Sequence, residues 1–439
     1  MTAISLRAKL IGMGSGAAVL GGVAAIVIGV LSSEGYLPGD GMQRVWEAPR
    51  DRDAADHGNA SWLHGDVVVR SRFDSVTGYD VATGRKRWEY VVPGQAEICA
   101  TGSTASRDGI AVVAFGVDGD SAEEGAGCTT AAAIDLKTGD ELWRTPITSH
   151  SGRLDAEPDL VAVGGGLAVV RDTDPGSAYD KTVPAGEALR AVDARTGKPR
   201  WKAAVPKGCV PHRAGAGEKQ VVAVLVCERT ELRIAAFGIA DGKALWSGPL
   251  DARRPVADDA TVSLRSVEPL VVQVDAEQER GVHAFLAFGA DGKPRGRIEL
   301  TGEYGEIMAD SAGKVVVTDD RLIAFAEYPY ESYTRHQVVG FDLGTGEPVW
   351  RKGFEFDDAV ALHAGGGRVT AMVSRSGKRE WDEDLHVFDA RTGEEKDVRS
   401  FSEDVDRIGT LGLHVHPGGL VIAVRWGDAV SPLSAYETW

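Results

Sequence analysis

Cysteine and positive charge are both scarce in this sequence, and each scarcity excludes a class of protein. Four cysteines in 439 residues are too few for a fold built from disulfides, although they allow individual bridges. An excess of 65 acidic over 48 basic residues gives a net charge of −17, which argues against nucleic acid because phosphates attract a basic surface. Hydrophobic residues make up 43% of the chain, so bulk disorder is excluded. The 55 glycines favour short strands and tight turns.

The N-terminal segment has the pattern of a membrane anchor. Arg7 and Lys9 precede an uncharged stretch at 10–31, whose 22 residues at about 1.5 Å each span about 33 Å, enough for a bilayer core of about 30 Å. Positive charge on the N-terminal flank alone predicts a cytoplasmic N-terminus. The alternative is a cleaved signal peptide, but no small-x-small cleavage site follows the stretch.

These features divide the chain into four segments. We predict a cytoplasmic N-terminus at 1–9, a transmembrane signal anchor at 10–31, a linker at 32–42 and one extracytoplasmic domain at 43–439. The part beyond the anchor has 46 basic and 65 acidic residues, a net charge of −19. The predicted localisation is therefore the cell membrane, with an acidic domain outside the cytoplasm.

A turn motif of the form D-x-x-T-G-x-x-x-W recurs along this domain. The complete copies contain Asp80, Gly84 and Trp88; Asp135, Gly139 and Trp143; Asp193, Gly197 and Trp201; and Asp342, Gly346 and Trp350. Weaker copies contain Gly242 with Trp246, Gly292, and Gly393. The seven glycines lie 45 to 58 residues apart, with a mean spacing of 51.5 residues. Such a period indicates a repeat architecture.

Each copy has the pattern of a strand, a turn and a second strand. Apolar residues precede the Asp, whose carboxylate accepts hydrogen bonds from turn amides, and the Gly supplies a positive φ. The Trp lies on the outgoing strand, where it can bury against a neighbouring repeat. Two further strand-like runs precede each copy. Four strands in about 50 residues are typical of a blade of a β-propeller.

The two ends of the domain complete one more blade. Residues 420–426 and 433–437 are expected to form its second and third strands, and the chain stops before a fourth. Trp46 lies near the other end in a segment that resembles the Trp-bearing outer strands. We therefore predict an all-β, eight-bladed propeller of four-stranded blades, closed by pairing of the N- and C-terminal strands, with seven blades as the alternative.

The repeat resembles that of the PQQ-like β-propellers, an eight-bladed fold shared by quinoprotein alcohol dehydrogenases and by non-enzymatic outer-membrane assembly lipoproteins. The resemblance covers the chain from about residue 43 to the end. It implies the fold but not the function, because one scaffold hosts both catalysts and binders. The Ala-, Gly- and Arg-rich composition, with Asn59 as the single asparagine, is typical of a high-GC bacterium.

The marks of the quinone enzymes in this family are missing. The chain has no adjacent cysteine pair, no C-x-x-C-H haem motif, and no asparagine besides Asn59 to serve as a calcium ligand. It also has no G-x-S-x-G, P-loop or H-E-x-x-H motif. We therefore predict no cofactor and no catalysis, with PQQ and calcium kept only as alternatives.

The four cysteines fit an exported protein. Cys99 and Cys209 are expected on the innermost strands of their blades, Cys128 follows an acidic insertion, and Cys227 ends a second strand. Pairing within blades gives Cys99–Cys128 and Cys209–Cys227, which an oxidising exterior permits. The alternative is four buried free thiols.

Three other groups of residues were considered as sites. An acidic loop offers carboxylates to calcium but fits no EF-hand, so a solvated loop is expected; it comprises Asp118, Asp120, Glu123 and Glu124, with Asp172 and Asp174 as a weaker fragment. His414 and His416 are expected on an inner strand, facing the central channel without a metal. Tyr328, Tyr330 and Tyr333 form an aromatic hairpin suited either to recognition or to ordinary packing.

The predicted function is binding or scaffolding at the bacterial cell envelope. The partners expected are envelope proteins, and the membrane is contacted through the N-terminal helix. An acidic domain favours a basic or cationic partner, with association that weakens as salt increases. The alternatives are a PQQ-dependent oxidoreductase and a cell-wall or glycan binding module.

Overall fold

The computed structural model describes residues 41–51, 59–117, 127–147, 159–172, 189–203, 205–228, 230–309, 313–331, 333–354, 357–375, 383–401, 405, 410–426 and 431–438. Throughout these ranges every regular element is a β-strand. No membrane-crossing helix occurs in them, and the predicted anchor at residues 10–31 lies outside them. The acidic loop at residues 118–124 and Asp174 also lie outside the described residues.

The strands form antiparallel sheets of successive chain segments. The first three sheets are β2 (Ala60–His64), β3 (Val67–Arg72), β4 (Ser75–Asp80) and β5 (Lys86–Val91); β6 (Glu97–Thr101), β7 (Ile110–Val117), β8 (Gly127–Asp135) and β9 (Glu141–Pro146); and β10 (Val161–Gly164), β11 (Leu167–Arg171), β12 (Leu189–Asp193) and β13 (Pro199–Lys202). The next two are β14 (Cys209–Ala216), β15 (Gln220–Cys227), β16 (Glu231–Gly238) and β17 (Ala244–Pro249); and β18 (Thr261–Val267), β19 (Leu270–Asp275), β20 (His283–Phe288) and β21 (Pro294–Glu299).

The last two sheets depart from the simple four-stranded pattern. One contains β22 (Thr301–Gly302), β23 (Gly305–Ile307), β25 (Arg321–Tyr330), β26 (Tyr333–Asp342) and β27 (Pro348–Phe354), with β24 (Val315–Val317) paired to β25. The other has eight strands in the order β28 (Asp357–Gly365), β29 (Arg368–Arg375), β30 (Glu383–Asp389), β31 (Glu395–Phe401), β1 (Gly41–Glu47), β34 (Leu433–Thr438), β33 (Val421–Trp426) and β32 (Thr410–Val415).

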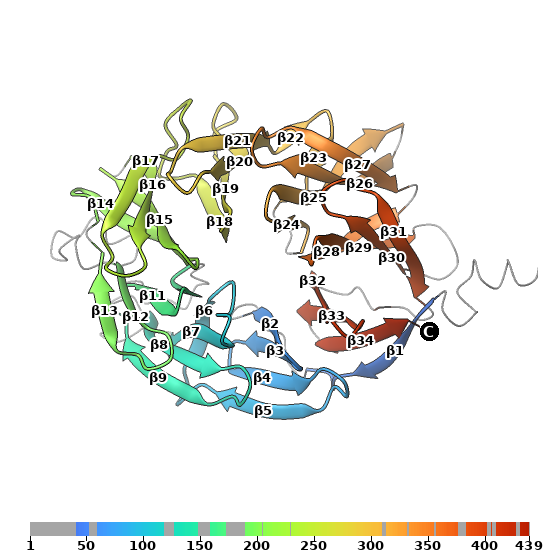
Figure 1. The fold of residues 1–439 in the computed structure, drawn as a ribbon, viewed down its shortest axis with the longest axis horizontal. Coiled ribbons are helices and arrows are strands. Elements are labelled where there is room, and N and C mark those ends of the chain that lie inside the picture. Colours follow the sequence, from blue (N-terminus) through green and yellow to red (C-terminus); the bar gives the residue numbers. More distant parts are fainter. Residues whose placement is uncertain are drawn as a thin grey trace, which may run out of the picture.

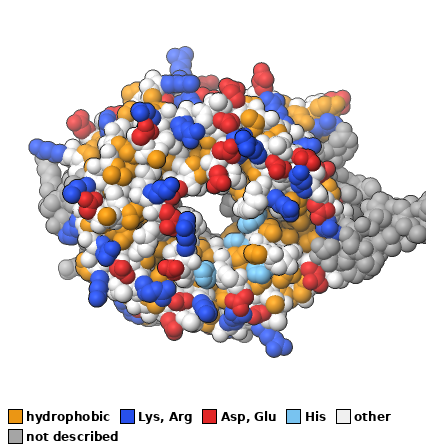
Figure 2. All heavy atoms as spheres, viewed as in Figure 1, with side chains coloured by type: hydrophobic (Ala, Val, Ile, Leu, Met, Phe, Trp, Pro, Cys, Tyr) orange, Lys and Arg blue, Asp and Glu red, His pale blue; other side chains and the backbone are white. Residues whose placement is uncertain are grey.

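The sheets stand around a central opening as a β-propeller (Figure 1). Strands such as β2, β6, β18, β24 and β28 lie toward the opening, and outer strands such as β5, β9 and β13 run along the rim (Figure 1). Figure 2 shows that the opening is not filled by side chains on the side in view. Every residue of the middle strand β15 is buried, and all of them after Gln220 are apolar, because both faces pack against neighbouring sheets.

The first and last of the described strands meet in the eight-stranded sheet. β1 pairs antiparallel with β34, from Met42 opposite Thr438 to Glu47 opposite Ser434, and parallel with β31 through Gly41 and Ser400. A buried apolar cluster links this region to the β2–β5 sheet; its fully buried members are Trp46, Ala48, Val68, Val81, Ile422, Val424, Leu433 and Ala435. The N-terminal strand therefore contributes to both pairing and packing where the ring closes.

Strand order gives the ring two distinct faces. In each four-stranded sheet the turns after the first and third strands leave from one edge, here called the turn face, as do the turns after β24 and β26 in the β22–β27 sheet and those after β28, β30 and β32 in the eight-stranded sheet. The connections after the second and fourth strands leave from the opposite edge, here called the loop face. Third-to-fourth-strand connections such as 81–85, 136–140 and 390–394 are five residues long, whereas 172–188 on the loop face has 17 residues. Length variation is thus concentrated on the loop face.

Candidate functional site

The repeat motif forms the turns between the third and fourth strands. In the first repeat, an Asp80 carboxylate oxygen accepts hydrogen bonds from the Thr83 amide at 2.9 Å and from its hydroxyl at 2.8 Å. Gly84 closes the turn at φ +66°. The Asp193, Asp342 and Asp389 carboxylates accept the same pair of bonds from their threonines, whereas Asp135 accepts from the Lys137 amide. The Thr196 bonds hold the pKa of Asp193 below the usual value. The pKa of Asp80 is lowered first by a hydrogen bond from Arg87 and then by the bonds from Thr83.

Each motif tryptophan joins its sheet to the next one around the ring. The Trp143 ring lies against Gly197, where an added Cβ would come within 2.6 Å of it, and its Nε1 donates to the Ala194 carbonyl at 2.8 Å. The same contact recurs between five further tryptophan–glycine pairs: Trp46 with Gly84, Trp88 with Gly139, Trp201 with Gly242, Trp246 with Gly292, and Trp350 with Gly393. Glycine is therefore required at this position for two reasons: the backbone has a positive φ, and the indole ring leaves no room for a Cβ.

Two junctions depart from this pattern. Trp88 packs on Gly139, but its buried Nε1 has no hydrogen-bond partner among the described residues. Between the β18–β21 sheet and the next, the outer strand has no Trp; its backbone lies directly against Gly346, and the Gly296 amide donates to the Leu343 carbonyl at 2.9 Å. A backbone contact thus replaces the indole at the junction that follows the motif copy of Gly292, which has no Trp.

The two cysteine pairs predicted from the sequence are the two disulfides of the structure, Cys99–Cys128 and Cys209–Cys227. Cys99 lies on β6 and Cys209 on β14, the innermost strands of their sheets, and Cys227 ends β15. Cys209 and Cys227 are directly opposed in the register of β14 and β15. Both bridges cross-link strands within one sheet.

A second belt of contacts joins the inner strands around the central opening. Side chains on or next to one inner strand bond to the next inner strand around the ring or to a residue beside it: Trp62 to the Gly102 carbonyl, Arg213 to Val262, Arg265 to Ala309, Lys314 to Ala359, His363 to Leu413, and His414 to the Ser61 hydroxyl. The His414 Nε2 to Ser61 Oγ distance is 2.9 Å, and it joins β32 to β2, the last and first inner strands. Histidine side chains are visible beside the opening (Figure 2).

His414 is partly buried between His363 on β28 and Ser61 on β2. The His363 ring centroid lies 6.3 Å from that of His414. Burial, together with the charge of His363, lowers the pKa of His414 to about 4. Burial also lowers the pKa of His363. His416 follows β32, and its Nδ1 accepts a hydrogen bond from the Gly418 amide at 3.0 Å. His414 therefore contacts neighbouring inner strands, whereas His416 accepts a hydrogen bond within the turn that follows β32.

We expect the free energy of unfolding of His414→Gln to fall less, as pH decreases below 6.5, than that of the unsubstituted protein. Because the folded-state pKa of His414 is lowered, the unfolded chain binds the proton more readily between pH 6.5 and 4, so the free energy of unfolding falls as pH drops through this range. The loss attributable to this residue is about 3 kcal/mol. His283→Gln is the control of opposite sign, since a hydrogen bond to Asp275 raises the pKa of His283. Urea unfolding at a series of pH values measures both, and a pH dependence in His414→Gln equal to that of the unsubstituted protein would contradict the assignment.

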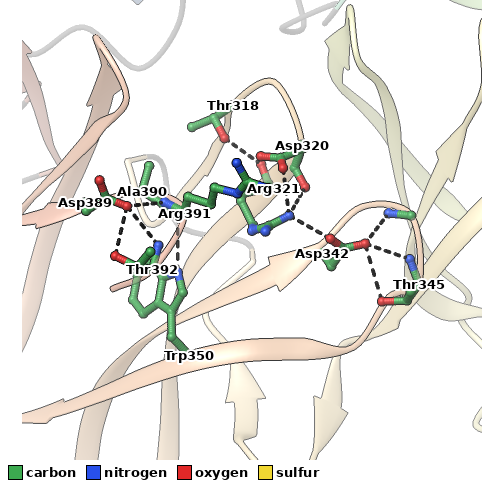
Figure 3. Close-up of polar contacts among 11 residues, drawn as sticks. Thr318, Asp320, Arg321, Asp342, Thr345, Trp350, Asp389, Ala390, Arg391 and Thr392 are labelled. Carbon is green, nitrogen blue, oxygen red and sulfur yellow. Dashed lines mark hydrogen bonds and ion pairs between the residues drawn. The ribbon is translucent and has the colours of Figure 1, made fainter. Parts of the chain in front are cut away.

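A pocket of 560 Å³ opens on the turn face between the β22–β27 sheet and β28–β31. Its lining residues come from three turns: Val317, Thr318, Asp319, Asp320, Ala364, Gly365, Gly366, Gly367, Ala390 and Arg391. Figure 3 shows Thr318 and Asp320 on one side and the turn of Arg391 and Thr392 on the other. An added Cβ at Gly366 or Gly367 would meet no atom within 4 Å, so the glycine turn leaves the space open.

The pocket wall is held by an ion-pair network centred on Arg321. Its guanidinium lies 3.1 Å from the Asp320 carboxylate and 2.7 Å from that of Asp342, and the side chain is only 8% exposed (Figure 3). Although burial opposes it, hydrogen bonds from Thr345 and Gly344 and the charge of Arg321 keep the pKa of Asp342 below its usual value. The pocket therefore combines an ion-paired wall with exposed glycine backbone.

Two buried arginines that the sequence did not predict hold connections on the loop face. Arg70, on β3, is 4% exposed and lies 2.7 Å from the Asp51 carboxylate. Arg425, on β33, is 1% exposed and donates to the Ser434 hydroxyl and to the Ser431 and Val405 carbonyls. Each lies toward the loop-face end of a second strand and binds residues of the connections on that face. An arginine after an apolar run, as in residues 67–70 and 421–425, was the available signal.

The comparisons with known proteins agree with this architecture. A family model described as outer membrane protein assembly factor BamB matches residues 45–174, 161–352 and 233–407. The chain is 26% identical to outer membrane protein assembly factor BamB of Burkholderia pseudomallei over 186 residues. These residues make up 42% of this chain and 42% of the relative, so the match spans less than half of that protein. The computationally designed Ika8 protein covers 90% of this chain and 99% of its own at a TM-score of 0.51 and 15% identity, a likeness that shows the fold alone. Since the family model spans most of the sequence, the chain belongs to the family of outer membrane protein assembly factor BamB.

Proposed function

We propose that this chain is a membrane-tethered, eight-bladed propeller that binds proteins of the cell envelope and holds them together without catalysis. The observation that carries the proposal is membership of a family described as an assembly factor, on a ring whose variable connections gather on one face. Such a ring presents loops on a rigid frame, which suits recognition.

The count of eight blades rests on the eight-stranded sheet. Its strand order divides into β28–β31 and a second four-stranded half made of β32, β33, β34 and β1. Trp46, on β1, packs on Gly84 of the next sheet as the other motif tryptophans pack on theirs. We therefore interpret this second half as an eighth blade with strands from both ends of the chain.

The tether is residues 10–31, with the N-terminus in the cytoplasm and the propeller outside. The uncharged stretch, its flanking Arg7 and Lys9, and the two disulfides support this topology, because disulfides persist in oxidising compartments. The net charge of −19 beyond the anchor favours partners with basic surfaces.

Cross-linking of the full chain in its native membrane, followed by affinity capture, tests the function. We expect the same envelope proteins to be recovered in repeated captures, with yields that fall as salt increases. A chain with the charge-reversed anchor flank (Arg7→Glu and Lys9→Glu) serves as the topology control, and external protease should then degrade it less.

Two outcomes would replace this proposal with another. Alcohol-dependent dye reduction by the purified chain after incubation with PQQ and Ca²⁺ would make it an oxidoreductase. Specific retention on a glycan array, without any protein captured from the membrane, would make it a cell-wall binding module.

A further inference from the structure

The β25–β26 hairpin extends beyond the sheet that contains it. Its two strands have ten residues each, the longest among those described. β25 pairs with β23 only as far as Glu327, and β26 pairs with β27 only from His336. Past these points, residues 328–335 pair with no third strand in the described part of the chain. This two-stranded ribbon projects at the loop face.

One face of the ribbon carries three tyrosines and an arginine. The register places Tyr328 opposite Arg335 and Tyr330 opposite Tyr333, so all four side chains share a face, here called the tyrosine–arginine face. The Arg335 guanidinium lies 3.6 Å from the Tyr330 ring centroid and donates to the Tyr333 hydroxyl at 3.1 Å. Tyr330 is 39% exposed.

These contacts fix the side chains before any partner arrives. The two tyrosine ring centroids lie 5.5 Å apart, and the guanidinium also lies 5.5 Å from the Tyr333 ring. Cation–π contact and a hydrogen bond restrict the rotamers of Arg335 and both tyrosines, so binding costs less side-chain entropy. Tyrosine and arginine are also the residue types that most often dominate the energy of protein interfaces.

The geometry favours a protein segment over a sugar or an added strand. The tyrosine rings are tilted by 55° and the guanidinium covers one side of Tyr330, so no flat platform is available for stacking a sugar ring. Pro329 has no backbone N–H, which disfavours strand addition along the outer edge of β25. Recognition at this site therefore depends on the side chains of the ribbon.

The charge of the ribbon differs between its faces. On the opposite face, His336 lies 3.8 Å from the Glu327 carboxylate and 3.6 Å from that of Asp358. The tyrosine–arginine face presents a guanidinium among aromatic rings. Its chemical complement is a carboxylate flanked by apolar side chains.

We propose that the tyrosine–arginine face docks a segment of a partner protein that bears a carboxylate among apolar side chains. Arg335 donates to the carboxylate, and Tyr330 and Tyr333 pack against the apolar neighbours. This inference rests on the scaffold function above and names the surface through which one partner is held.

Site-specific photo-cross-linking in the full chain, in its native membrane, tests the proposal. The probe is p-benzoyl-phenylalanine in place of Tyr330; the control position is Val349, which is 48% exposed on β27 of the same sheet. We expect light-dependent coupling to one protein from position 330 at least fivefold above position 349. The coupled peptide should contain Asp or Glu between apolar residues.

Charge variants in the probe-bearing chain test the role of Arg335. Arg335→Glu should lower the coupling yield at least fivefold, whereas Lys352→Glu, the same charge change at an exposed position of β27, should leave it within twofold. Arg335→Lys keeps the charge but not the planar stacking, and an intermediate yield is expected. Thermal melting of each variant verifies that the fold is retained.

Equal coupling at both positions, a yield insensitive to Arg335→Glu, or an adduct removed by muramidase would overturn the proposal. If cross-linking of the full chain in its native membrane, followed by affinity capture, recovers a partner that position 330 does not label, this inference fails and the scaffold function stands. If neither experiment recovers a protein, the scaffold function fails as well.

Discussion

Trp46→Ala is expected to lower the free energy of unfolding by about 3 to 5 kcal/mol, the range for deleting a buried aromatic side chain. The Trp46 ring is 9% exposed, covers Gly84, and donates from Nε1 to the Val81 carbonyl at 2.8 Å. It lies in the cluster that joins the last strands of the chain to the first sheet, so its loss weakens the closure of the ring.

Urea unfolding followed by circular dichroism measures this effect. Val45→Ala is the matched control, because Val45 is the adjacent residue and is 40% exposed; its effect should stay within about 0.5 kcal/mol. Trp88→Ala should cost less than Trp46→Ala, since the Trp88 Nε1 has no hydrogen-bond partner to lose among the described residues. A Trp46→Ala protein as stable as Val45→Ala would show that Trp46 does not close the ring.

Asp51→Ala is expected to destabilise the protein by about 3 to 5 kcal/mol, because it leaves a buried arginine without its counter-ion. Asp51 lies 2.7 Å from Arg70 and 3.5 Å from Arg72, and its side chain is 15% exposed. Burial already lowers the pKa of Arg70 despite the attraction of Asp51. Removing the carboxylate therefore leaves only the desolvation cost.

A double variant separates this explanation from a general loss of packing. Asp51→Ala combined with Arg70→Met should be more stable than Asp51→Ala alone, because no unpaired charge is then left at position 70. Glu89→Ala is the control for an exposed pair, Lys86 with Glu89, and should change stability by less than about 1 kcal/mol. If the double variant is less stable than both Asp51→Ala and Glu89→Ala, the unpaired charge of Arg70 is not the cause of the destabilisation.

The sequence predicted those features that repeat. The Asp, Gly and Trp of the motif recur with a period of 51.5 residues, which was enough to infer a propeller, and the Trp46 segment was recognised by its likeness to the outer strands. The disulfides followed from the same alignment of repeats, since strand position placed each cysteine beside its partner.

Features that occur once were not predictable, because nothing in the repeat signals them. Ser61 and His414 are 353 residues apart and meet only because the ring closes. The pocket depends on three glycines in one turn and two carboxylates in another, which no local pattern connects. Arg70 and Asp51 pair across a connection whose path strand periodicity does not define. The tyrosine hairpin was visible in sequence, but its shared face required the register of β25 and β26.

Pairing of the N-terminal strand with the C-terminal strand is the central structural claim, and one cross-link tests it directly. Gln43 lies opposite Glu437 in the register of β1 and β34. In the full chain carrying Gln43→Cys and Glu437→Cys, dibromobimane should bridge the two thiols and yield one linked peptide pair by mass spectrometry. The offset pair Gln43→Cys and Ser434→Cys should yield far less. A bridge that forms equally in both pairs, or in neither, would contradict closure by β1.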